Sequence, residues 1–146
     1  MPSAPAAAER SPEQAAQAFL RAFDRLEWEP FRSYFADDMT MFFPFAQTPA
    51  RVDGRAAVEK VFESFFRAKR QQLADAGAPM TQGLTARDMK VQMAGADAAV
   101  VTFHLGSETN PARRSLVLRR TAGEWKVIHW HASGIGTVPS GSIEVK

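Results

Sequence analysis

The chain has 146 residues, of which 45% are hydrophobic and 23% are charged. This length suits one soluble domain with a single hydrophobic core. Cysteine is absent, which excludes a disulfide scaffold, a thiol nucleophile and any metal site built on cysteine.

The formal net charge is only +2, and basic residues alternate with acidic ones along the chain. A nucleic-acid-binding protein more often carries a continuous basic surface, so we expect no nucleic-acid partner. No apolar run is long enough to cross a bilayer, so we expect no membrane association. Residues 1–10 lack the basic start and apolar core of a signal peptide. We therefore predict a flexible tail over 1–10, one domain over 11–146, and a cytoplasmic protein.

The first half of the sequence predicts helices. Ser11 followed by a proline is typical of a helix N-terminus, and apolar residues recur at helical spacing through residues 13–28. A second, short helix is predicted over 28–36, followed by an apolar strand over 37–45. The clearest helix lies within residues 50–77, starting at Asp53 or Gly54.

The second half predicts strands over 84–95, 97–106, 113–123 and 124–134, with a turn at 121–123. Three helices followed by a meander of strands indicate the α+β class, with the helices on one side of a curved antiparallel sheet. The last ten residues, TVPSGSIEVK, are expected to add a short strand or to cover a neighbouring element.

Several segments resemble the nuclear transport factor 2-like superfamily, in the same order along the chain. They are FADDMTMFFP, VDGRAAVEKVFESFF, MAGADAAVVTFHL and EWKVIHWHASG, and the similarity covers about residues 11–136. The most specific element is the spacing of Trp125, His129, His131, Ser133 and Gly134. Within the superfamily the chain is similar to the SnoaL-like branch, which includes the association domain of calcium/calmodulin-dependent protein kinase II.

The resemblance implies a cone-shaped α+β roll, in which three N-terminal helices pack on a strongly curved antiparallel sheet around a deep cavity. It also implies a homodimer whose sheets pack together. Members include ketosteroid isomerases, polyketide cyclases, dehydratases and limonene epoxide hydrolases, so the fold predicts a cavity without a particular chemistry.

Two departures from the kinase association domains indicate a more apolar cavity. The positions of their cavity arginines correspond to Leu105, Ser115 and Ala132, and phenylalanines occupy positions 43 and 45 where acids are expected. The three-arginine anion pocket is therefore not carried over.

His129 and His131 are the candidate catalytic residues. Side chains two residues apart on a strand point to the same face of the sheet, so the two imidazoles are expected to lie side by side. Symmetric pairing about the predicted turns places Phe103 opposite Ser115, Ser115 opposite His129 and Arg113 opposite His131. It places His104 on the other face, so no third ligand is expected and we predict neither a metal nor a cofactor. A histidine base acting near neutral pH remains possible.

We predict a dimeric small-molecule-binding domain whose ligand is apolar or weakly acidic. Its predicted ligand-binding residues are Tyr34, Phe42, Phe45, Phe62, Phe103, Leu105, Arg113, Ser115, His129 and His131. A second copy is expected to cover the opposite sheet face, with Leu116, Leu118, Ile128 and Trp130. Two alternatives stay open: a lyase or isomerase of the cyclase, dehydratase or ketosteroid isomerase type with a histidine base, and an association module for a partner protein.

Overall fold

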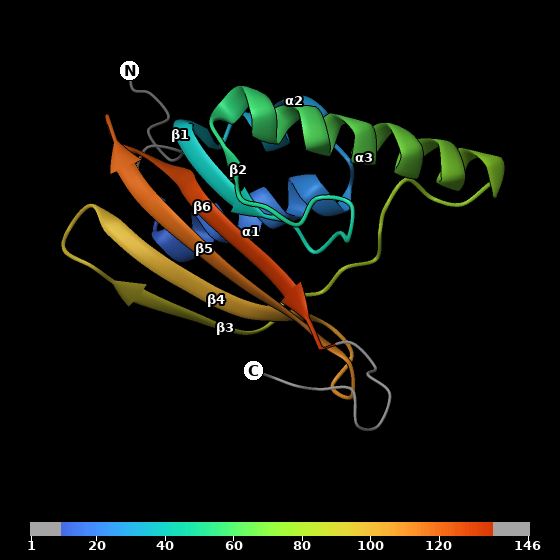
Figure 1. The fold of residues 1–146 in the computed structure, drawn as a ribbon. Helices are drawn as coiled ribbons and strands as arrows, with labels where there is room; N and C mark the ends of the chain where they lie inside the picture. Colours follow the sequence, from blue (N-terminus) through green and yellow to red (C-terminus); the bar gives the residue numbers. More distant parts are fainter. Residues whose placement is uncertain (1–9, 136–146) are drawn as a thin grey trace, which may run out of the picture.

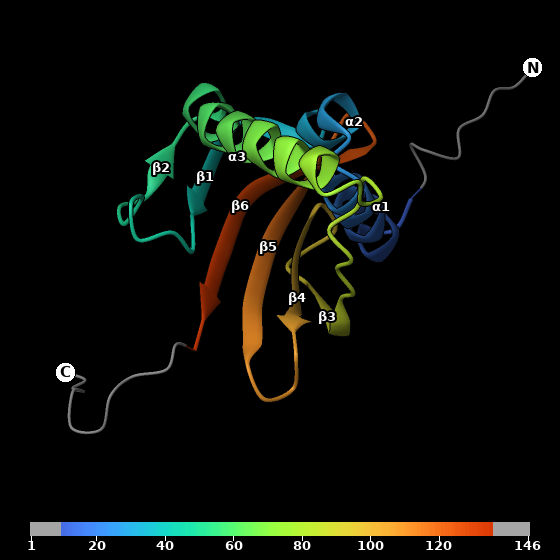
Figure 2. The same cartoon turned by 90° about the vertical axis from the view of Figure 1, so that its right-hand side faces the viewer.

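The computed structural model describes residues 10–135, and Figure 1 shows how their elements are arranged. In this part of the chain, three helices cover one face of a six-stranded sheet that is visibly curved in Figure 2. The helices are α1 (Pro12–Asp24), α2 (Trp28–Arg32) and α3 (Arg55–Asp75). The strands are β1 (Phe35–Phe42), β2 (Val52–Asp53), β3 (Arg87–Met93), β4 (Ala98–Gly106), β5 (Pro111–Thr121) and β6 (Glu124–Gly134). The predicted α+β class is confirmed.

The predicted terminal segments lie largely outside the described residues. Of the tail over 1–10, only Arg10 is described, and of the predicted segment at 137–146 nothing is described. Within the described part, no helix is long and apolar enough to cross a membrane.

The sheet is mixed, which corrects the prediction of purely antiparallel strands. Its order is β2-β1-β6-β5-β4-β3, and β1 runs parallel to β6, with Thr40 beside His129. The other neighbouring strands pair antiparallel. A parallel pair needs a long connection, and α3 together with β2 to β5 supplies it here.

The helix starts agree with the sequence signals. Ser11 caps α1 through a capping box with Gln14, whose backbone N–H donates to Ser11 Oγ over 3.1 Å. Gly54 precedes α3 with a positive φ of 93°, a conformation that glycine adopts at little cost. The two residues before it form β2 against β1, a strand too short to be predicted from its sequence pattern.

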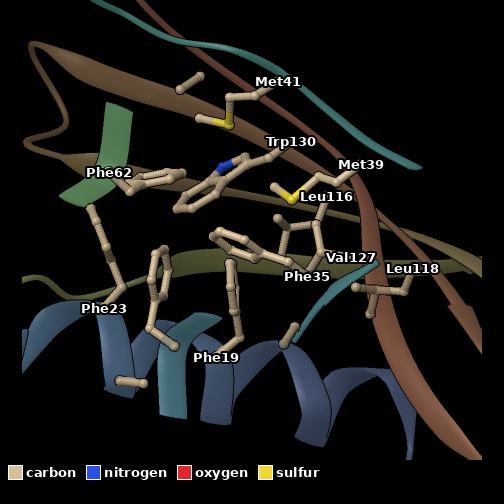
Figure 3. Packing of buried hydrophobic residues seen from close by; sticks show 14 of the residues in the cluster. Phe19, Phe23, Phe35, Met39, Met41, Phe62, Leu116, Leu118, Val127 and Trp130 are labelled. Atoms are coloured by element: carbon tan, nitrogen blue, oxygen red, sulfur yellow. The ribbon is translucent and has the colours of Figure 1, made fainter. Parts of the chain in front are cut away.

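Aromatic side chains from the helices and the sheet form the core (Figure 3). Trp130 of β6 lies at its centre: its ring centroid is 5.1 Å from that of Phe19, 5.5 Å from Phe23 and 5.6 Å from Phe62. Phe31 of α2 is fully buried and stacks on Phe19 at 4.9 Å. Edge and offset contacts of this kind stabilise beyond simple area burial, so this cluster fixes the helices on the sheet.

Strand pairing differs from the predicted register at two points. The β5–β6 turn has only two residues, Ala122 and Gly123, with φ of 53° and 78°, as in a tight hairpin with both central residues left-handed. A bulge after Val117 shifts the pairing once more, so Ser115 lies opposite His131 and Arg113 opposite Ser133. The prediction that Ser115 faces His129 and Arg113 faces His131 was wrong.

The β4–β5 pairing is also one residue away from the prediction. Phe103 lies opposite Arg114 instead of Ser115, because Gly106 pairs directly with Pro111. A shift of one residue moves a whole strand's side chains to the other face of a sheet. Phe103 and Leu105 therefore share the helix-covered inner face with Leu116 and Trp130.

Candidate functional site

The sequence-predicted site residues divide between the two faces of the sheet. The inner face, against the helices, carries Phe103 and Leu105. The outer face, which the described helices do not cover, carries a second group of predicted residues: Phe42, Arg113, Ser115, His129 and His131. Since a β-sheet separates the groups, they cannot form one cavity wall as predicted.

Tyr34 lies apart from both groups, in the connection between α2 and β1. Its hydroxyl accepts a hydrogen bond from Arg10 Nη1 over 2.6 Å, and its carbonyl accepts one from the backbone N–H of Val127. The contacts link the segment before α1 to the sheet. The Tyr34 ring also packs edge-on against Phe19, with centroids 5.7 Å apart, so it lies at the margin of the core.

A hollow of about 340 Å³ lies between the inner face and the helices, and we refer to it as the inner hollow. It is bordered by α1, α3, the end of β1, the segment after α3 and three sheet strands. Its lining is Phe23, Met41, Phe43, Pro44, Phe45, Phe62, Phe65, Gln82, Leu84, Leu105, Gly106, Ala112, Arg114, Trp130 and Ala132. Phe45, Phe62 and Leu105 are thus the predicted site residues that the structure brings together here.

Arg114 is the one charged side chain in the lining of the inner hollow. Its Nη1 donates to the carbonyl oxygens of Arg113 at 3.0 Å and of Ser133 at 3.3 Å. Among the described residues, no carboxylate lies within ion-pairing distance of this guanidinium. Burial lowers the pKa of Arg114, because the charge is partly withdrawn from water without a counter-charge. The hollow therefore favours an anionic group beside Arg114.

Arg114 was missed in the sequence, although a signal for it exists. Positions 114, 116 and 118 alternate along β5, and Leu116 and Leu118 are the buried residues of that strand. Because side chains two residues apart on a strand share a face, an arginine two and four residues before two core leucines points toward the core. The predicted site instead included Arg113 and Ser115, whose side chains lie on the opposite face of β5.

The outer face places His129 and His131 beside a phenylalanine. Thr40 Oγ1 and His129 Nδ1 lie 2.7 Å apart in a hydrogen bond. The Phe42 ring centroid is 5.6 Å from that of His129 and 5.3 Å from that of His131. Burial, then the neighbouring His131, lowers the pKa of His129, which favours a neutral imidazole.

His104 lies on the outer face too, opposite Arg113, so its predicted placement on the other face was wrong. It lies on β4, separated from β6 by β5, and its Nδ1 is 3.7 Å from Asp88 Oδ2. No group of three His, Asp or Glu side chains within residues 10–135 is arranged to hold a metal ion.

The lowered pKa of His129 predicts a pH-dependent stability. The unfolded imidazole takes up a proton more readily than the folded one, so the free energy of unfolding should fall as the pH drops below about 6.5. Replacing the ring by an amide (His129→Asn) should remove this part of the slope. Chemical denaturation at fixed protein concentration across pH 8 to about pH 5 measures it.

The matched control is His104→Asn, which removes another imidazole from the same face of the sheet. We expect it to leave the slope largely intact. A slope that survives His129→Asn but disappears in His104→Asn would contradict the assignment.

The comparisons with known proteins agree with this architecture. A family model described as a SnoaL-like domain matches residues 13–137. No curated protein matches the chain significantly.

Three solved structures illustrate the similarity. An NTF2-like protein of unknown function from Pseudomonas putida KT2440 has a TM-score of 0.68 at 21% identity, with 92% of each chain covered. A protein assigned as a calcium/calmodulin-dependent protein kinase type II association domain from Thiobacillus denitrificans has a TM-score of 0.59 at 28% identity, covering 86% of this chain and 96% of that one. A ketosteroid isomerase-like protein from Erwinia carotovora atroseptica has a TM-score of 0.63 at 20% identity, covering 86% of this chain and 94% of that one. With a family model that spans most of its length, the chain belongs to the SnoaL-like domain family, and it shares its fold with nuclear transport factor 2-like (NTF2-like) proteins.

Proposed function

We propose that the inner hollow binds a small apolar organic acid whose carboxylate pairs with Arg114. The observation that carries this proposal is a half-buried guanidinium that lines an otherwise uncharged hollow and has no carboxylate partner among the described residues. A ligand carboxylate would supply the missing counter-charge through a charge-assisted hydrogen bond, which is among the stronger kinds. Without it, only two hydrogen bonds to backbone carbonyl oxygens offset the partial desolvation of the guanidinium.

The walls of the hollow indicate the body of such a ligand. Phe43 stacks on Phe45 with ring centroids 5.7 Å apart, and Phe62 stacks on Trp130. Flat aromatic walls make favourable offset contacts with another flat ring. A volume of about 340 Å³ lies at the lower end of the range of about 300–1,000 Å³ for ligand sites, which suits a compact aromatic acid.

A histidine base acting in the hollow receives no support from this geometry. His129 and His131 lie across the sheet from it, and its described lining contains no histidine, tyrosine, aspartate or glutamate. Acid–base catalysis requires a titrating group within hydrogen-bond reach of the reacting proton. Binding is therefore the function that the hollow supports best.

We also propose that the outer face of the sheet is the interface of a homodimer. Its half-exposed residues include Phe42, Val100 and Val117, which lie in register across neighbouring strands with Ser115 and His129. Apolar sheet surface of this kind is commonly covered by a partner. The association-domain assignment of the Thiobacillus denitrificans protein supports self-assembly as well.

The expected interface differs from the sequence prediction. Leu116, Leu118 and Trp130, which a second copy was expected to cover, are buried by the helices of their own chain. In this proposal Ser115, His129 and His131 contribute to the dimer contact instead of the ligand site.

Replacing Arg114 should weaken the binding of an aromatic carboxylate. We expect Arg114→Gln to raise the dissociation constant for phenylbutanoate about 10- to 150-fold, because a hydrogen bond to a charged group contributes about 1.5–3 kcal/mol. Isothermal titration calorimetry on the purified protein measures this. The neutral amide of the same acid should bind wild type and variant with similar affinity.

Arg113→Gln is the matched control, since it removes the same charge one residue away on the opposite face. Its affinity for phenylbutanoate should equal that of wild type. A loss confined to Arg113→Gln, or wild-type affinity in Arg114→Gln, would overturn the assignment of the hollow.

A charge placed at the centre of the outer face should separate the dimer. We expect wild type to sediment as a dimer and Val117→Lys as a monomer, because an unpaired ammonium would be buried at the interface. Met80→Lys, which adds the same charge on an exposed residue after α3, should stay dimeric. Analytical ultracentrifugation measures all three.

A monomeric wild type, or a Val117→Lys variant that remains dimeric, would contradict this interface. An assembly larger than a dimer that persists in Val117→Lys would instead favour the association-module alternative.

A further inference from the structure

The indole N–H of Trp130 is buried without a hydrogen-bond acceptor. Among the described residues, its Nε1 is the one buried side-chain nitrogen or oxygen atom that lacks a partner. Trp125 shows the usual arrangement, because its Nε1 donates to the carbonyl of Arg10 over 3.0 Å. An unsatisfied buried donor costs about 1–3 kcal/mol, so its presence in a core calls for a reason.

The Trp130 ring is held in place and cannot turn to find an acceptor elsewhere. It stacks on Phe62 at an interplanar angle of 22°, while Phe19 and Phe23 contact it edge-on at 65° and 79°. In Figure 3 the edge of the indole that carries the nitrogen points toward Met41. Both Trp130 and Met41 border the inner hollow.

Met41 is the kind of side chain that can yield to a ligand. Methionine is unbranched and has three rotatable bonds, so it repacks at low cost. Met41 lies beside Trp130 in the pairing of β1 with β6, so a ligand that displaces the end of the Met41 side chain would reach the buried N–H.

Trp130 and Arg114 are also close enough to hold one small molecule. Arg114 lies opposite Ala132, and Leu116 lies opposite Trp130, so Arg114 and Trp130 are diagonal neighbours on the inner face. Diagonal positions in an antiparallel pair are about 7–8 Å apart. Side chains that start this close together can be contacted by a single short organic acid.

We infer that the ligand of the inner hollow is an aromatic oxo acid, whose carboxylate pairs with Arg114 and whose carbonyl oxygen accepts from Trp130 Nε1. This inference rests on the proposed function and adds a second polar contact to it. A carbonyl suits the site better than a hydroxyl, because an indole N–H only donates and a hydroxyl would bring a further donor that needs its own acceptor. The phenylalanine walls hold the ring of the ligand.

The test compares acids that differ by one oxygen. Benzoylacetate, benzoylpropanoate and benzoylbutanoate are each paired with the phenylalkanoate of the same carbon count, so the carbonyl is sampled at three distances from the carboxylate. In wild type we expect the oxo acid of at least one pair to bind about 3- to 10-fold more tightly, as one additional neutral hydrogen bond provides. Calorimetry gives the ratio of the two dissociation constants.

Trp130→Phe keeps an aromatic ring but removes the N–H. In this variant the ratio of the two dissociation constants should fall to about one, even if both acids bind more weakly. Trp125→Phe, which removes an indole outside the hollow, should keep the wild-type ratio. Arg114→Gln should weaken the binding of both members of a pair.

A ratio of one in all three wild-type pairs, or a ratio that survives Trp130→Phe, overturns the inference while leaving the carboxylate site at Arg114 intact. No binding of any acid overturns the inference and the proposed function together.

A spectroscopic measurement covers the case in which Trp130→Phe does not fold. The protein has three tryptophans, so ¹⁵N-labelled protein gives three indole N–H signals. Trp28→Phe and Trp125→Phe assign the Trp130 signal by elimination. The preferred oxo acid should move that proton downfield as a hydrogen bond forms, and its phenylalkanoate partner should not. Equal shifts with both acids, or none, would contradict the contact.

Discussion

The pairing of β5 with β6 determines which side chains meet the helices and which face outward. Each strand alternates between faces, so the two-residue turn at Ala122 and Gly123 and the bulge after Val117 together decide which face each side chain takes. The inner set, with Leu116, Leu118 and Trp130, is almost fully buried. Full burial of such a side chain stabilises by about 1.5–3 kcal/mol, so a slip by one residue would lose several kcal/mol and bury polar groups in exchange.

Two features of the inner face do not serve this packing. Arg114 lies on the same face of β5 as the core leucines. Its guanidinium donates to two backbone carbonyl oxygens, but no carboxylate among the described residues pairs with its charge. Trp130 fills the centre of the core and yet leaves its N–H unpaired. Both border the same hollow, whose remaining lining is mostly phenylalanine and aliphatic residues. Departures from good core packing concentrate at functional sites, and a ligand with a carboxylate and a carbonyl oxygen would resolve both.

Much of the architecture follows from the sequence, because its signals are local. The Ser11 cap, the glycine before α3 and the alternation within the strands each depend on a few neighbouring residues. The family was identified from the segments as well, and the family model confirms it. The parallel pairing of β1 with β6 was not predicted from the residues, since it joins the two ends of the domain.

The candidate site was harder to predict, because it depends on turn lengths and a bulge. The β5–β6 turn is one residue shorter than expected, and a bulge follows Val117. Together they leave Ser115 and His131 on the same face of the sheet, but every residue of β5 from Ser115 to the turn pairs with a different residue of β6 than predicted. Between β4 and β5, the pairing register differs from the predicted one by a single residue. This difference places Phe103 and Leu105 on the opposite face of the sheet from His129 and His131. The histidine-bearing strand therefore does not mark the hollow. Arg114 does, because it alternates with the buried Leu116 and Leu118 along β5.

The most direct measurement is a crystal structure of the protein with benzoylpropanoate, because it distinguishes the two faces of the sheet. We expect the acid to lie between the phenylalanine walls on the helix side of β5, with its carboxylate within hydrogen-bonding distance of Arg114. An acid bound on the outer face against His129 and His131, with the inner hollow empty, would contradict it.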